Sequence, residues 1–137
     1  MNLAERLLKI DKGEFNKERT KQVKSEQLSI LIGEPAKIIL KELNPQEVLD
    51  ITSAMIDSEG NPEIKKTFNT NAILTAAAVI EPNLKDDALL KYLGVATPAE
   101  AAKKLFKGEV NRIAEIINKM AGFDPNRKED TDEEIKN

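Results

Sequence analysis

Residues 72–80, AILTAAAVI, are apolar on nearly all sides of a helix, and they constrain the fold more than any other stretch of the chain. A helix without a polar face must be buried, so other elements have to surround it. Glu81 and Pro82 follow the run, and a residue that precedes proline avoids the helical region. The run therefore predicts a buried central helix that ends before Pro82, inside a compact, mainly α, multi-helix domain.

Proline at the first helical position, after a residue that can cap the helix, marks three helix starts: Asn44-Pro45, Asn61-Pro62 and Thr97-Pro98. Thr97 is followed three residues later by Glu100, which is the pattern of a capping box. Asp86-Asp87 favours a further helix start, and Gly122 favours the end of the last helix. The polar triplet at residues 69–71 could divide the helix that follows Pro62.

A small β element is predicted near residues 21–42. Residues 36–42 contain the β-favouring run Ile38-Ile39-Leu40, so we expect a strand there. Its partner would be residues 21–25 or 27–32, which gives two strands that helices must cover. A helix over residues 25–32 fits nearly as well, because short apolar runs do not separate the two structures.

The N-terminal part is predicted to be loosely attached. Residues 2–11 have the spacing of a short amphipathic helix, with Leu3, Leu7 and Ile10 on one face. Residues 11–24 are polar and mostly basic, which is typical of a solvated linker, with an arm that touches an acidic partner as the alternative. We therefore expect residues 1–20 to be a helix and linker.

The C-terminal residues 124–137 are predicted to be a disordered acidic tail. Ile135 is their one apolar residue, so they cannot bury enough surface to offset the entropy lost on ordering. The expected organisation is a single mostly helical domain over residues 1–123, followed by this tail.

The composition argues against an enzyme. The 137 residues include no histidine and no cysteine, which removes the commonest general base, the commonest metal ligands and the thiolate nucleophile. Asp86 and Asp87 are adjacent, so on a helix they point in different directions and do not converge on a reacting atom. The sequence therefore predicts no catalytic, metal or cofactor-binding residues and no cofactor.

Charge and hydropathy favour a protein that works through its surface. The net charge of −3 is mild and mixed, so we expect no nucleic-acid partner. No apolar run approaches a membrane span and the first residues lack the apolar core of a signal peptide, so a soluble cytoplasmic protein is expected, without a membrane partner. A small helical DNA-binding regulator is the alternative, since residues 85–121 could form three short helices, although Arg112 and Lys119 are the only cations of the last one.

Residues 78–106, AVIEPNLKDDALLKYLGVATPAEAAKKLF, resemble the XkdN-like family of phage tail assembly chaperones. Similar blocks lie on both sides: IGEPAKIILKELNPQEVLDI upstream and GEVNRIAEIINKMAGFD downstream. The resemblance implies a non-catalytic protein of a phage or prophage, in the cytoplasm of a bacterial host. Its expected partners are the tape measure protein, the tail tube protein or both, and self-association into a homo-oligomer is compatible with it.

Four residues near the turn at residues 81–87 are candidates for partner binding: Leu84, Leu90, Tyr92 and Phe106. They are large apolar or aromatic side chains that would serve as contacts if exposed. Such residues lie in the core more often than at an interface, so the structural alternative is stronger for each of them.

Overall fold

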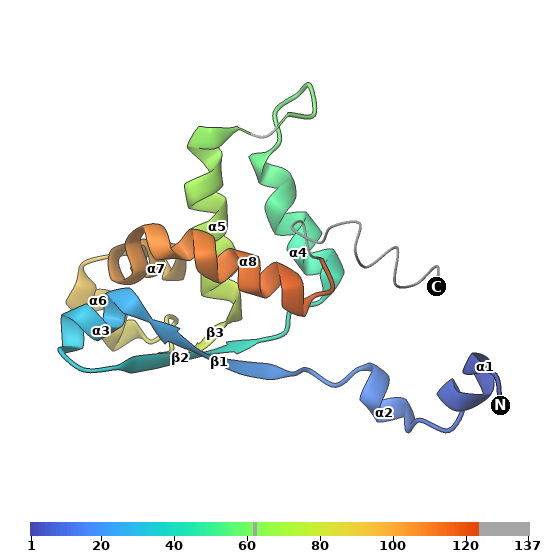
Figure 1. The fold of residues 1–137 in the computed structure, drawn as a ribbon. Coiled ribbons are helices and arrows are strands. Elements are labelled where there is room, and N and C mark those ends of the chain that lie inside the picture. The colour runs from blue at the N-terminus through green and yellow to red at the C-terminus, as the bar shows by residue number, and fades with distance from the viewer. Residues whose placement is uncertain (62, 124–137) are drawn as a thin grey trace.

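A computed structural model describes residues 1–61 and 63–123. Helix α5 (Ile64–Ala78) runs through the middle of the fold, and helices α7 (Pro98–Phe106) and α8 (Val110–Met120) pack across it (Figure 1). A small antiparallel sheet lies at the end where α5 terminates. The expectation of a mainly α fold built around a buried central helix is confirmed.

The sheet contains three strands, so the prediction of two is wrong. Strands β1 (Thr20–Ser25), β2 (Ala36–Lys41) and β3 (Val79–Glu81) lie in the order β1-β2-β3. The third strand comes from the end of the apolar run that was expected to remain helical: α5 ends at Ala78, and Val79 is already extended, with φ −73° and ψ 119°. Val79 and Glu81 pair with the free edge of β2, opposite Leu40 and Ile39, and the β-branched Val79 and Ile80 favour the extended conformation.

Residues 26–32 form a helix, which settles the alternative left open for this stretch. Strand β1 stops at Ser25, whose hydroxyl accepts a hydrogen bond from the Leu28 amide at 3.2 Å and so caps α3 (Glu26–Ile32). Gly33 then ends α3 with φ +84°, a conformation that a side chain makes costly. The strand at residues 21–25 is therefore confirmed, and a strand at 27–32 is wrong.

Helix α4 (Pro45–Thr52) starts as predicted, but α5 does not. Asn44 accepts a hydrogen bond from the Gln46 amide and caps α4, which continues as the short 3₁₀ turn η1 (Ser53–Met55). The amide of Asn61 instead donates to the Asp57 carboxylate at 2.9 Å, so Asn61 belongs to a turn and α5 begins at Ile64. The triplet at residues 69–71 does not interrupt α5, because Thr70 faces the core.

The C-terminal block follows its capping signals closely. Asp86 caps α6 (Asp87–Leu93) by accepting from the Ala88 amide, and Gly94 ends that helix with φ +72°. After α7, the 3₁₀ turn η2 (Lys107–Glu109) leads into α8. Gly122 has φ +96° and the Phe123 amide donates to the Asn118 carbonyl at 2.8 Å, which is the expected Schellman end.

The Thr97 cap of α7 is predicted to contribute measurably to stability. Thr97 Oγ1 accepts from the Glu100 amide at 3.2 Å, whereas Glu100 Oε2 accepts from the Ala96 amide, one residue earlier than in a standard capping box. Thr97→Ala should lower the free energy of unfolding by about 0.5–2 kcal/mol. Urea denaturation measures this change, and Thr97→Ser is the control because it keeps the hydroxyl. Equal losses in the two variants would show that the cap is not the cause.

The core is aliphatic apart from one ring. Phe106 is the only aromatic side chain that is fully buried within the described part of the chain. It lies in one cluster with residues of the sheet, of α5 and of α8, among them Ile38, Leu40, Leu74, Ile113 and Ile117. The single cluster indicates that these elements fold as one unit.

The N-terminal residues lie away from this core. The single helix expected at residues 2–11 is replaced by α1 (Leu3–Leu7) and α2 (Lys12–Phe15), both without buried residues. Figure 1 shows α1 and α2 beyond the start of β1, off the body of the fold. The division into a domain at 1–123 and a tail stays a prediction, and residues 124–137 lie outside the described residues.

Candidate partner-binding surface

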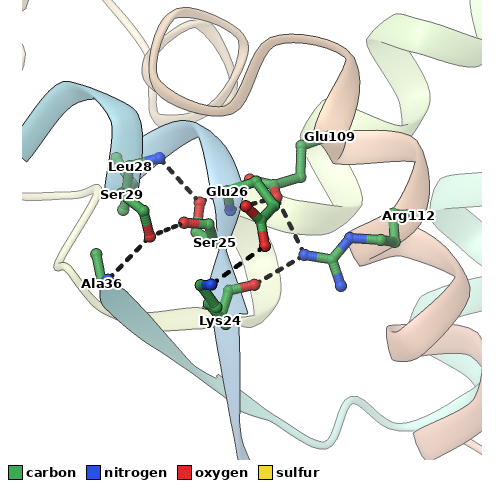
Figure 2. A network of polar contacts seen from close by, with 8 residues as sticks. All are labelled: Lys24, Ser25, Glu26, Leu28, Ser29, Ala36, Glu109 and Arg112. Carbon is green, nitrogen blue, oxygen red and sulfur yellow. Dashed lines mark hydrogen bonds and ion pairs between the residues drawn. The ribbon is translucent and has the colours of Figure 1, made fainter. Parts of the chain in front are cut away.

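A buried carboxylate joins two distant parts of the chain. Glu109 accepts from the Ser25 hydroxyl at 2.6 Å through one oxygen, and from the Glu26 amide at 2.8 Å and Arg112 at 3.0 Å through the other (Figure 2). Arg112 also donates to the Lys24 carbonyl at 2.8 Å. These contacts fix the start of α3 against the start of α8.

The chemistry of Glu109 is that of a structural clamp. Its side chain is only 6% exposed, and burial by itself raises the pKa of the carboxyl. The hydrogen bonds from Ser25, Arg112 and the Glu26 amide, together with the charge of Arg112, outweigh that effect and hold the pKa below its usual value. Both oxygens are occupied, so Glu109 is poorly placed to exchange protons with a substrate. Sequence reasoning missed this clamp, because its two halves lie 84 residues apart.

The described residues contain no group of three or more carboxylates that could hold a metal ion. No helix within the described residues is long and apolar enough to cross a membrane.

Large apolar side chains gather at the surface in three places, and three more, Ile73, Ile80 and Tyr92, are exposed singly. The first is the N-terminal segment, the second is the end of α3, and the third is the pair formed by α4 and α5. Their members are Met1, Leu3, Leu7, Leu8, Ile10 and Phe15; Ile30, Leu31 and Ile32; and Leu49, Ile56, Ile64 and Phe68. Exposed apolar residues in such groups mark candidate interaction surfaces.

The pair α4–α5 projects from the body. In Figure 1 both helices rise together past α7 and α8, and their connection lies at the far end. We call this projection the crest and define it as residues 44–61 and 63–68. The backbone holds its two sides together, since the Glu63 amide donates to the Met55 carbonyl at 2.6 Å.

One face of α5 is exposed near the N-terminal end of the helix and buried further along it. Ile64, Phe68 and Thr75 share that face, because they are spaced by four and seven residues. Their exposed fractions are 89%, 39% and 0%, which shows where α7 and α8 stop covering the helix. The ammonium of Lys103 on α7 lies 6.0 Å from the centre of the Phe68 ring and marks the edge of the covered part. The part of this α5 face that lies in the crest is therefore apolar and exposed, whereas the rest of the same face is buried.

The four residues predicted to bind a partner have different positions in the structure. Leu84 and Phe106 are 1% and 0% exposed, so both fill the core, which was the stronger alternative for each, and neither offers a surface contact. Leu90 is half-buried against the core. Tyr92 is 89% exposed and stays a candidate. The crest was missed because Ile64 and Phe68 have the spacing that puts them on one helix face with the buried Thr75, and periodicity does not show how much of such a face other elements cover.

The comparison with known families decides where the chain belongs. The family model of phage XkdN-like tail assembly chaperone proteins matches residues 4–136. The chain belongs to this family. The match covers nearly the whole sequence and confirms the resemblance seen in residues 78–106. Membership gives the chain a role in phage tail assembly.

A solved structure supports the fold. The crystal structure of the protein YqbN is similar to this chain with a TM-score of 0.52 and 16% sequence identity, and the similarity covers 77% of this chain and 87% of that one. At this identity the likeness concerns the fold alone. The search of curated proteins found no match.

Proposed function

We propose that this chain is a non-catalytic assembly chaperone that binds the tape measure protein, the tail tube protein or both before the tail is complete. The observation that carries the proposal is the family match over residues 4–136. A chaperone of this kind acts in the cytoplasm of the bacterial host, where tail proteins accumulate before they assemble. Self-association of the chain is compatible with this role.

The surface of the protein supports binding more than chemistry. The chain lacks histidine and cysteine, and the buried Glu109 is held by three donors. The exposed apolar side chains of the crest are suited to contact an amphipathic helix, since such helices dock by placing their apolar face against another apolar surface. Reversible binding through a few such side chains would let the partner leave when the tube assembles.

The DNA-binding alternative has less support. A recognition helix needs free cations along the face that enters the groove. On α8, Arg112 is engaged by Glu109 and the Lys24 carbonyl, and the apolar face is buried in the core. Lys119 is the other cation of that helix.

Co-expression tests the proposal. The tagged chain is produced with the tape measure protein or the tail tube protein of the same phage or prophage, and soluble yield and co-purification are measured. The proposal expects at least one of them to co-purify and to become more soluble than when it is produced alone. Co-purification of neither would contradict it, and duplex DNA affinity that falls steeply with salt would support the regulator instead.

A further inference from the structure

The crest combines exposed apolar side chains with a net negative charge. It carries five acids against Lys65 and Lys66, a net charge of −3, and residues 44–61 contain no lysine or arginine. The acids are Glu47, Asp50, Asp57, Glu59 and Glu63. This charge accompanies the apolar residues Leu49, Ile56, Ile64 and Phe68, which remain exposed on the same projection.

Four of the five acids make no ion pair with another described residue; the exception is Glu63, which pairs with Lys66 at 2.9 Å. The Asp57 carboxylate accepts from the amides of Glu59 and Asn61, and the Asp50 carboxylate accepts from the Gln46 side chain, at 2.9 Å each. Glu47, Asp50 and Glu59 are exposed residues. Exposed charges of this kind steer partners of opposite charge and raise the association rate.

We propose that the crest docks one amphipathic helix of the tail partner, whose apolar face packs on Ile64 and Phe68 and whose flanks carry lysine or arginine. The proposal rests on the proposed function and names the docking surface and the kind of segment that fits it. Two observations support it: the exposed start of an α5 face that is buried further along, and the net negative charge of the crest as a whole, most of whose acids lie in residues 47–59. A docked helix would extend the packing that already covers Thr75.

The other two apolar groups lack a matching argument. Residues 1–19 carry five basic and four acidic side chains, so their nearly balanced charge favours neither an acidic nor a basic partner. The end of α3 has three exposed apolar residues, Ile30, Leu31 and Ile32. Glu34 is the only charged residue between them and the start of β2, so this group has no cluster of charge beside it. Among these three groups, the crest is the one in which apolar exposure coincides with a net charge of −3.

A matched pair of variants tests the apolar contact. Ile64→Asp and Tyr92→Asp introduce the same charge at side chains that are equally exposed, 89% each, on α5 and α6. Affinity of the full chain for the co-purifying tail protein is measured by titration, and thermal unfolding confirms that both variants fold. Ile64→Asp should weaken binding roughly tenfold or more, as for a residue at the centre of a contact. Tyr92 is the rival candidate on α6, and the inference expects Tyr92→Asp to leave binding unchanged.

Synthetic helices test the charge preference. Two peptides share one leucine seam at helical spacing, and their flanks carry lysines in one and glutamates in the other. The chain should bind the lysine-flanked peptide several-fold more tightly at low salt, and the difference should shrink as salt is added. The double variant Glu47→Lys, Asp50→Lys should reduce or reverse that preference.

The outcomes separate this inference from the proposed function. If the wild-type chain binds a tail protein and Ile64→Asp binds it equally well, the crest is not the docking surface and the proposed function stands. A loss in Tyr92→Asp alone would place the contact on α6 and overturn the inference in the same way. If the wild-type chain binds neither the tape measure nor the tail tube protein, the proposed function fails, and this inference fails with it.

Discussion

Replacement of Phe106 by alanine is expected to lower the free energy of unfolding by about 3–5 kcal/mol, the range for removing a large buried aromatic side chain. Phe106 is fully buried and is the only buried aromatic ring in the described residues, so its removal leaves a cavity between elements that no neighbouring ring can fill. Because a small domain is stable by only about 5–15 kcal/mol, such a variant should be close to unfolding at 37 °C. Urea denaturation followed by circular dichroism measures the change.

Tyr92→Ala is the control for this prediction. Tyr92 is 89% exposed, and surface substitutions of this kind change stability by no more than about 0.5 kcal/mol. Both residues were candidates for partner binding on sequence grounds, so the pair separates a core role from a surface role. A Phe106→Ala protein of nearly normal stability would contradict the core position of that ring.

Replacement of Glu109 by glutamine is expected to cost about 1.5–3 kcal/mol, the range for hydrogen bonds to a charged group. The Ser25 hydroxyl, the Glu26 amide and Arg112 all donate to the carboxylate, and an amide presents a donor of its own at one of the two positions. One of these donors would therefore lose its acceptor inside the clamp. Glu115→Gln, at an exposed position on α8, the helix that follows Glu109, is the control and should leave stability unchanged.

Acid should abolish the contribution of Glu109. Its pKa is lowered in the folded protein, so the folded state releases this proton at a lower pH than the unfolded state does. The stabilisation is complete above the ordinary glutamate pKa of 4.5 and is lost as pH falls through the lowered value. Wild-type and Glu109→Gln unfolding curves should therefore differ most above pH 4.5 and approach each other below it. A difference that stays constant with pH would contradict this account.

Local chemistry predicts much of this fold from the sequence. Asn44, Asp86, Thr97 and Gly122 act at the helix ends to which their residue types are suited, because capping depends on neighbours within a few residues. The buried central helix can also be predicted from the sequence, since the run at residues 72–78 has no polar face. These features need no knowledge of distant contacts.

Long-range contacts explain the misses. Val79 is extended because it pairs with the edge of β2 in the sheet, and β2 lies some forty residues earlier in the chain. Glu109 reads as a polar residue beside a glycine until the fold brings Ser25 to it. Ile64 lies on the same helix face as the buried Thr75, yet it is 89% exposed, because α7 and α8 cross α5 away from its N-terminal end. The candidate surface could therefore be found only after the folding of the whole chain was known.

Amide hydrogen exchange of the full chain, with and without the tail protein that it binds, tests the central claim most directly. The account predicts slower exchange in the crest, over α4 and the first two turns of α5, and no change in α6 around Tyr92. Unchanged exchange in the crest, with slower exchange in α6 or in no element of the body, would contradict it.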